Sequence, residues 1–127
     1  MSSLIRRLGL ALVATVALSG PALAQAFDVV GTYVVRGSNP GESGVYGAEV
    51  KVSLEGEVYH LEWTSAGQKV LGVGLRLGDT LAITWQDDKT KDAAVGAFIV
   101  MPDGSLKGRW APLGADAAGT EDWTKKP

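Results

Sequence analysis

The chain has 127 residues, no cysteine, one histidine and a formal net charge of −2 at pH 7. A slight excess of acidic residues argues against nucleic-acid binding, which requires a basic surface, and against electrostatic docking to anionic lipid. Without cysteine there are no disulfides, so the fold depends on packing and hydrogen bonds alone.

The first 24 residues are typical of a cleavable secretory signal peptide. Two arginines at 6–7 precede an uncharged apolar run at 8–18, and Ala-Leu-Ala at 22–24 supplies the small residues that signal peptidase requires. The run is about half of the roughly 20 residues of a membrane span, so we expect no retained membrane anchor. Cleavage leaves Gln25 first, with cleavage after Ala26 as the near alternative. The predicted location is therefore periplasmic or secreted.

Residues 25–127 are predicted to form a single all-β domain. Short runs rich in Val, Ile, Leu, Tyr and Trp alternate with clusters of Gly, Pro, Asp and Asn, a spacing typical of a sandwich or barrel. Short links imply a meander, and closure removes exposed strand edges. We therefore predict a small antiparallel up-and-down barrel, with an open β-sandwich as the alternative. The eight expected strands are 28–36, 45–54, 57–64, 69–77, 81–86, 94–101, 105–111 and 119–125.

The first two hairpins are aligned by requiring that apolar side chains share a face. The first is expected to turn at Glu55-Gly56. The second is expected to have a three-residue loop, Gly78-Asp79-Thr80, because a two-residue loop would place Arg76 opposite Leu81. The expected inner pairs are Val52–Tyr59, Val50–Leu61 and Ala48–Trp63 in the first hairpin, and Leu77–Leu81, Leu75–Ile83 and Val73–Trp85 in the second. The expected outer pairs of the first are Lys51–His60 and Glu49–Glu62.

The third hairpin has the clearest turn, at Pro102-Asp103-Gly104. Proline presets φ for the turn and glycine accepts the left-handed position that follows. This turn places large residues opposite small ones, which suits a tightly curved interior. The expected pairs are Val100–Leu106, Phe98–Gly108 and Gly96–Trp110.

Residues for catalysis or metal binding are sparse. His60 is the only histidine and is expected on the outer face, and without cysteine no nucleophile–histidine site or zinc set can be assembled elsewhere. The expected neighbours Glu49 and Glu62 lie on the same exposed face, without the burial that perturbs catalytic carboxylates. The acidic loop 87–92 lacks the alternating ligands and glycine of a calcium loop. We expect a non-catalytic protein without a metal or cofactor.

Aromatic side chains provide the main candidate binding site. Three tryptophans fall near the ends of the third, fifth and seventh predicted strands, which run in one direction, so they should collect at one rim of a barrel. They form either a packed plug, the commoner arrangement in so narrow a barrel, or a cup for a small apolar or aromatic ligand. The candidate ligand-binding residues, all on the inner face or in the last strand, are Tyr33, Tyr59, Trp63, Trp85, Trp110 and Trp123.

The sixth predicted strand is apolar on both faces. Val95, Ala97 and Ile99 point away from the inner face, so either a loop of the domain or a partner protein should cover them. The stretch 37–44 is rich in turn-forming residues and is either a flexible connector or a binding loop. These features support a protein-interaction module as the alternative function, and they leave the oligomeric state open.

A set of short motifs runs through most of residues 31–121. They are Gly31-Thr32-Tyr33, Gly37-Ser38-Asn39-Pro40-Gly41-Glu42, Tyr46-Gly47-Ala48-Glu49-Val50, Trp63, Gly72-Val73-Gly74, Trp85, Asp103-Gly104-Ser105-Leu106-Lys107-Gly108-Arg109-Trp110 and Gly119-Thr120-Glu121. With them the chain resembles a group of small exported bacterial all-β proteins, some of which carry a fibronectin-binding label. It departs from the group in one loop, where Gly41 follows Asn-Pro directly. The resemblance implies export and, from the label, a protein partner, but no catalytic residues.

A looser resemblance is to the avidin and lipocalin barrels. Their first strand opens with Gly-x-Trp, and here that position is Gly31-Thr32-Tyr33, with tyrosine in place of tryptophan. The likeness implies an up-and-down barrel with a ligand inside. The polar residues with which avidins hold biotin have no match in this chain, so biotin binding is not implied.

Overall fold

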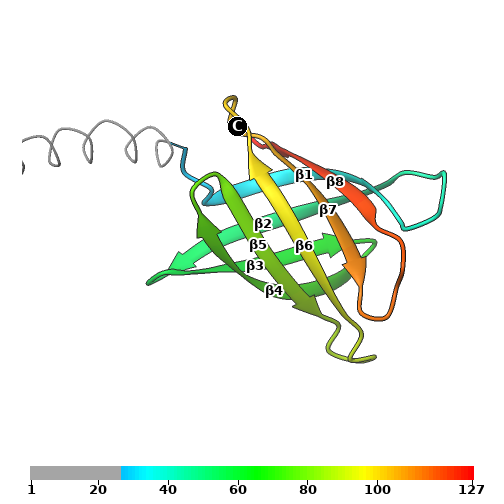
Figure 1. The fold of residues 1–127 in the computed structure, drawn as a ribbon. Helices are drawn as coiled ribbons and strands as arrows, with labels where there is room; N and C mark the ends of the chain where they lie inside the picture. Colours follow the sequence, from blue (N-terminus) through cyan, green and yellow to red (C-terminus); the bar gives the residue numbers. More distant parts are fainter. Residues whose placement is uncertain (1–26) are drawn as a thin grey trace, which may run out of the picture.

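A computed structural model describes residues 27–127, so the predicted signal peptide at 1–24 lies outside the described residues. Each strand pairs antiparallel with the next, and β8 pairs with β1 to close the barrel (Figure 1). The predicted up-and-down barrel is confirmed. No helix within residues 27–127 is long and apolar enough to cross a membrane. The strands are β1 (Gly31–Ser38), β2 (Tyr46–Glu55), β3 (Val58–Ser65), β4 (Gln68–Leu77), β5 (Thr80–Gln86), β6 (Ala93–Val100), β7 (Leu106–Pro112) and β8 (Gly119–Lys125).

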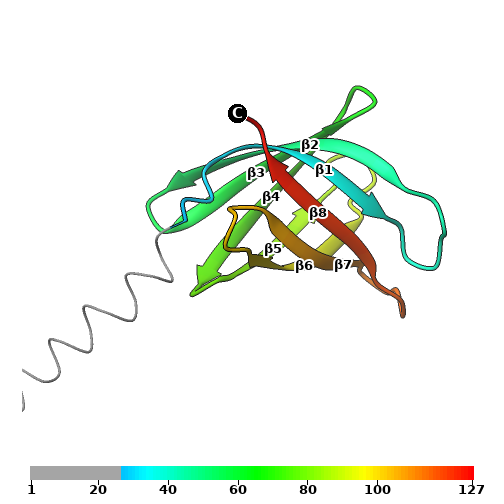
Figure 2. The same ribbon diagram turned by 90° about the horizontal axis from the view of Figure 1, so that it is seen from above.

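Figure 2 shows β1–β3 on one side of the barrel and β5–β7 on the other. The buried hydrophobic side chains form a core in the interior between them. Alternate side chains of each strand face this interior because successive residues of a strand point to opposite faces. Trp123 is at its centre, with ring centroids 4.5 Å from Phe98 and 5.7 Å from Tyr33. The largest fully buried side chains are Trp123, Tyr33, Phe98, Leu81, Leu106, Val29, Val35, Val50 and Val52.

The third hairpin has the predicted register. Phe98 pairs with Gly108, and the other two predicted pairs of this hairpin are also present. In the turn, Gly104 has a φ of 86° and its N–H donates to the carbonyl of Met101 over 2.9 Å. A side chain at Gly108 would meet the ring of Phe98. Packing therefore requires a residue without a side chain opposite Phe98.

The predicted register of the first hairpin is wrong by two residues. The loop consists of Gly56 and Glu57, and Gly56 takes the positive φ, 60°, that a two-residue hairpin needs at its first position. The observed partners are Leu54–Tyr59, Val52–Leu61 and Val50–Trp63 on the inner face, and Ser53–His60, Lys51–Glu62 and Glu49–Thr64 on the outer face. This register replaces a like-charge pair with an opposite-charge pair, which is favourable across strands. A shift of two residues keeps every side chain on its predicted face.

The predicted loop of the second hairpin is also wrong. The loop has two residues, Gly78 and Asp79, and Arg76 does lie opposite Leu81. Arg76 is accommodated because it lies at the end of the barrel, where its Nε donates to the carbonyl of Gly78 and its Nη1 to that of Phe27. Because the loop is one residue shorter than predicted, the side chains of β4 face the opposite way from the prediction. The inner face of β4 therefore carries Val70, Gly72, Gly74 and Arg76, and the outer face carries Leu71, Val73, Leu75 and Leu77.

Candidate functional site

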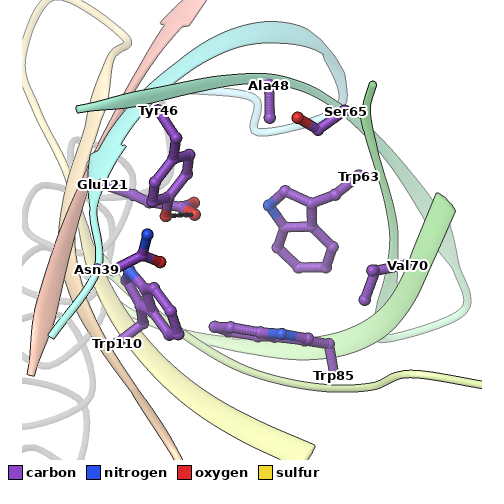
Figure 3. A pocket seen from close by; sticks show the side chains of 9 residues that line it. All are labelled: Asn39, Tyr46, Ala48, Trp63, Ser65, Val70, Trp85, Trp110 and Glu121. Carbon is purple, nitrogen blue, oxygen red and sulfur yellow. Dashed lines mark hydrogen bonds between the residues drawn. The ribbon is translucent and has the colours of Figure 1, made fainter. Parts of the chain in front are cut away.

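One end of the barrel contains a cavity of about 240 Å³. It lies at the rim where β3, β5 and β7 end, and Figure 3 shows its lining side chains converging from several strands. The lining is mostly apolar and aromatic, as in many small-molecule sites. The lining residues are Asn39, Tyr46, Ala48, Trp63, Ser65, Val70, Trp85, Trp110 and Glu121.

Three of the tryptophans predicted for this site form one wall of the cavity. The ring centroids of Trp63 and Trp85 are 5.3 Å apart, and those of Trp85 and Trp110 are 5.6 Å apart. Neighbouring rings are tilted by 43° and 51°, so together they make a curved aromatic surface. The three rings therefore pack against one another, as expected of a packed plug, but they leave a cavity beside them, as expected of a ligand-binding cup.

Glycines on the inner face of β4 create room for this aromatic wall. An ideal Cβ at Gly72 would lie 2.8 Å from Cζ3 of Trp63 and 2.6 Å from the carbonyl oxygen of Thr84. At Gly74 it would lie 2.9 Å from Cγ2 of Ile83. Real side chains do not approach so closely in a packed interior. Because Gly72 has no side chain, the ring of Trp63 can pack directly against the backbone of β4.

A buried carboxylate lies beside the wall. Glu121 is 6% exposed and accepts hydrogen bonds from Tyr46 Oη over 2.5 Å and from Trp123 Nε1 over 2.8 Å. Burial raises the pKa of Glu121 above its ordinary value, and burial next to this carboxylate also raises the pKa of Tyr46. Nearby, the indole N–H of Trp110 is buried and has no hydrogen-bond partner within residues 27–127. This side of the cavity is therefore polar and weakly solvated.

The other predicted site residues lie elsewhere. Trp123 and Tyr33 are fully buried in the core, where Tyr33 Oη donates to the carbonyl of Val29 over 2.7 Å and burial raises its pKa to about 12. Tyr59 lines a different pocket at the opposite end of the barrel, beside Arg76. The structure thus brings together three of the six predicted residues at the cavity.

Sequence reasoning missed two residues that shape the cavity, Glu121 and Tyr46. A signal for each was present. Glu121 lies two residues before Trp123 and so shares its inner face, and Tyr46 alternates with the inward residues Ala48 and Val50. From the predicted loop at 37–44, Asn39 reaches the cavity.

No cluster suited to a metal ion exists within residues 27–127. His60 lies on the outside of β3, where its Nε2 is 3.5 Å from a carboxylate oxygen of Glu55, and it is far from full burial. It faces Ser53 across the hairpin, and not Lys51 as expected.

The outside of β4, β5 and β6 carries a second notable feature, an apolar surface. Val95 and Ile99 are 61% and 51% exposed, so within the described residues no loop of the domain covers strand six, and the first of the two expected covers is wrong. Because β4 is turned over, its outward leucines extend this surface across β5. We call it the β4–β6 outer face, made of Leu71, Val73, Leu75, Leu77, Ala82, Thr84, Val95, Ala97 and Ile99.

No protein-family model and no curated protein matches the chain. Among solved structures it is similar to a redesigned β-barrel (TM-score 0.63, 13% identity, 86% of this chain and 99% of that one). It is also similar to a de novo designed fluorescence-activating β-barrel (TM-score 0.59, 18% identity, 84% and 98%). A third match is secretory abundant heat soluble protein 4 from Ramazzottius varieornatus (TM-score 0.47, 11% identity, 78% and 95%). The designed barrels show that the chain shares the fold of small closed β-barrels, and the resemblance to exported bacterial proteins stays a prediction from the sequence.

Proposed function

We propose that this protein binds a small apolar or aromatic molecule at the tryptophan-lined end of its barrel and catalyses no reaction. The observation that carries the proposal is the cavity of about 240 Å³ walled by Trp63, Trp85 and Trp110. An apolar cavity of about 150 Å³ is already large enough to hold benzene. An eight-stranded barrel has room inside for one such ligand.

The test is titration of the protein, purified without denaturation, with indole as an aromatic probe, followed by tryptophan emission and by native mass spectrometry. Binding should shift the emission and add the mass of one indole. Ala48→Leu fills part of the cavity and should weaken binding, whereas Ala111→Leu makes the same change at a position of β7 that does not line it. An unchanged emission and mass would contradict the proposal, and so would equal weakening by the two variants.

We also propose that the chain is exported and works in the periplasm or outside the cell. The support is the charge, apolar core and small-residue pattern of residues 1–24. Mass spectrometry of the protein from a periplasmic extract should give a chain that begins at Gln25 or, for the alternative cleavage, at Phe27. A chain that keeps residues 1–24 in the cytoplasm would refute export.

A second candidate function is protein association through the β4–β6 outer face. The face contains no charged residue to select a foreign partner, so we propose a second copy of the chain as its occupant. From strand spacings its footprint is roughly 400 Å², about half of the ~800 Å² per partner of a standard interface. We therefore expect a weak dimer.

Native mass spectrometry over a concentration series should show a dimer fraction that Leu75→Lys removes. A strictly monomeric chain at the highest soluble concentration would refute self-association. Loss of the dimer by substitution on the opposite, polar side, for example at Lys51, would place the interface elsewhere.

A further inference from the structure

The lining of the cavity has a negatively charged side chain and no positively charged one. Among its nine lining residues Glu121 is the only one with a charged side chain, and no lysine, arginine or histidine is present. Its two hydrogen-bond donors, Tyr46 and Trp123, are neutral groups. None of the ion pairs found within residues 27–127 involves this carboxylate. A buried carboxylate without a counter-charge is unfavourable, so a positive group in the cavity would stabilise it.

The aromatic wall is suited to the same kind of group. A cation is attracted to the face of an aromatic ring when it lies within about 6 Å of the centroid, and tryptophan attracts it best. The ring planes of Trp63 and Trp85 meet at 43°, so both rings contribute to the lining at an angle to each other (Figure 3). Tyr46 extends this wall beyond Trp110, with ring centroids 6.4 Å apart and planes at 76°. Several aromatic rings and one carboxylate thus surround a single small volume.

The loops around the mouth of the cavity carry more negative than positive side chains. The connections at this end are 39–45, 66–67, 87–92 and 113–118. An acidic rim raises the local concentration of cations and disfavours anions. The carboxylates of these loops are Glu42, Asp87, Asp88, Asp92 and Asp116, against the two lysines Lys89 and Lys91.

We propose that the cavity binds a small organic cation, with an ammonium or quaternary ammonium group against the tryptophan faces and next to the Glu121 carboxylate. This inference rests on the proposed function and adds the charge of the ligand to it. Neutral aromatic compounds can still enter the cavity, but they leave the carboxylate uncompensated. The preferred ligand combines a positive group with an apolar body that fits about 240 Å³.

The experiment compares choline with 3,3-dimethylbutan-1-ol, in which a carbon atom replaces the charged nitrogen and the shape is kept. Isothermal titration calorimetry of the protein purified without denaturation should give at least about tenfold tighter binding of choline. Indole is titrated in parallel as the neutral aromatic probe. This comparison needs no substitution, so it does not depend on a variant that folds.

Two variants then assign the preference to one carboxylate. Glu121→Gln removes the buried charge and should reduce the ratio of the two affinities by about tenfold. Glu62→Gln makes the same change on the outside of β3, in a carboxylate that pairs with Lys69 over 2.9 Å, and should leave the ratio unchanged.

The outcomes separate the two proposals. Indole binding together with equal affinities for choline and its neutral analogue would overturn the cation inference and leave the proposed function standing. If none of the three compounds binds, both proposals are overturned. A choline preference that Glu121→Gln and Glu62→Gln reduce equally would also overturn the inference, because it would then reflect only the overall charge of the protein.

Discussion

Replacing Gly72 by alanine tests whether the bare backbone of β4 supports the aromatic wall. The added methyl group would lie 2.6 Å from the carbonyl oxygen of Thr84 and 2.8 Å from the ring of Trp63. The first of these atoms belongs to the backbone of a paired strand and cannot rotate away. Overpacking of this kind costs about 1–3 kcal/mol of unfolding free energy.

The matched control is Gly47→Ala on β2. There the nearest atom to an ideal Cβ is the carbonyl oxygen of Val35, at 3.9 Å, an ordinary contact distance. Alanine in the middle of a strand is more stable than glycine by roughly 0.5–1 kcal/mol. The two variants should therefore change stability in opposite directions.

Thermal unfolding followed by circular dichroism, together with urea titration, measures this difference. For a domain of this size 1 kcal/mol corresponds to about 4–8 °C in Tm, so the two melting curves should be clearly separated. Gly72→Ala should also alter tryptophan emission, because Trp63 has to move. A Gly72→Ala protein as stable as Gly47→Ala, with unchanged emission, would refute the packing argument.

Three further predictions concern the register, the buried carboxylate and a turn. Leu75→Thr on the outside of β4 should change the unfolding free energy by less than about 0.5 kcal/mol, while Leu81→Ala in the core should cost about 2–5 kcal/mol; equal losses in urea titrations would mean that β4 faces the other way. Because burial raises the pKa of Glu121, this group stabilises the fold most below its ordinary pKa of 4.5, and its contribution falls as the pH rises through the raised value. The stability of the unsubstituted protein relative to Glu121→Gln should therefore decrease as the pH rises above the ordinary pKa of 4.5, and a constant difference would contradict the burial argument. Gly104→Ala should cost about 1–2 kcal/mol in the same assay, since this residue has a φ of 86°, and an unchanged midpoint would show that the turn adopts another conformation.

The barrel and the third hairpin could be predicted because local chemistry and alternation agree there. Pro102, Asp103 and Gly104 define the turn, and in β7 after the turn the inward residues alternate with lysine and arginine. The first hairpin shows the limit of alternation. A shift of two residues preserves every face, so the two registers differ only in the positive φ of Gly56 and in the charge pairing of Glu62 across the strands.

β4 could not be assigned from its own sequence. Its two faces read Val-Gly-Gly-Arg and Leu-Val-Leu-Leu from residue 70 onwards, so the usual rule places the second set inside. The interior is instead filled from the neighbouring strands. Trp63 and Trp85 leave space only for glycine at position 72, and Ile83 does the same at position 74. The orientation of β4 therefore depends on packing against residues that are distant in the sequence. Glu121 was missed for a related reason, because a charged residue is assigned to the surface unless its position beside Trp123 is taken into account.

Closure of the ring by β1 and β8 also completes the cavity. The β1–β8 ladder joins segments separated by nearly the whole domain, and contacts of such high sequence separation form slowly. Tyr46 begins β2 and Glu121 lies on β8, so the β1–β8 pairing brings Glu121 to the side of the cavity where Tyr46 lies. A ligand that touches both sides binds the closed ring and not its open precursor, and so shifts the folding equilibrium towards closure.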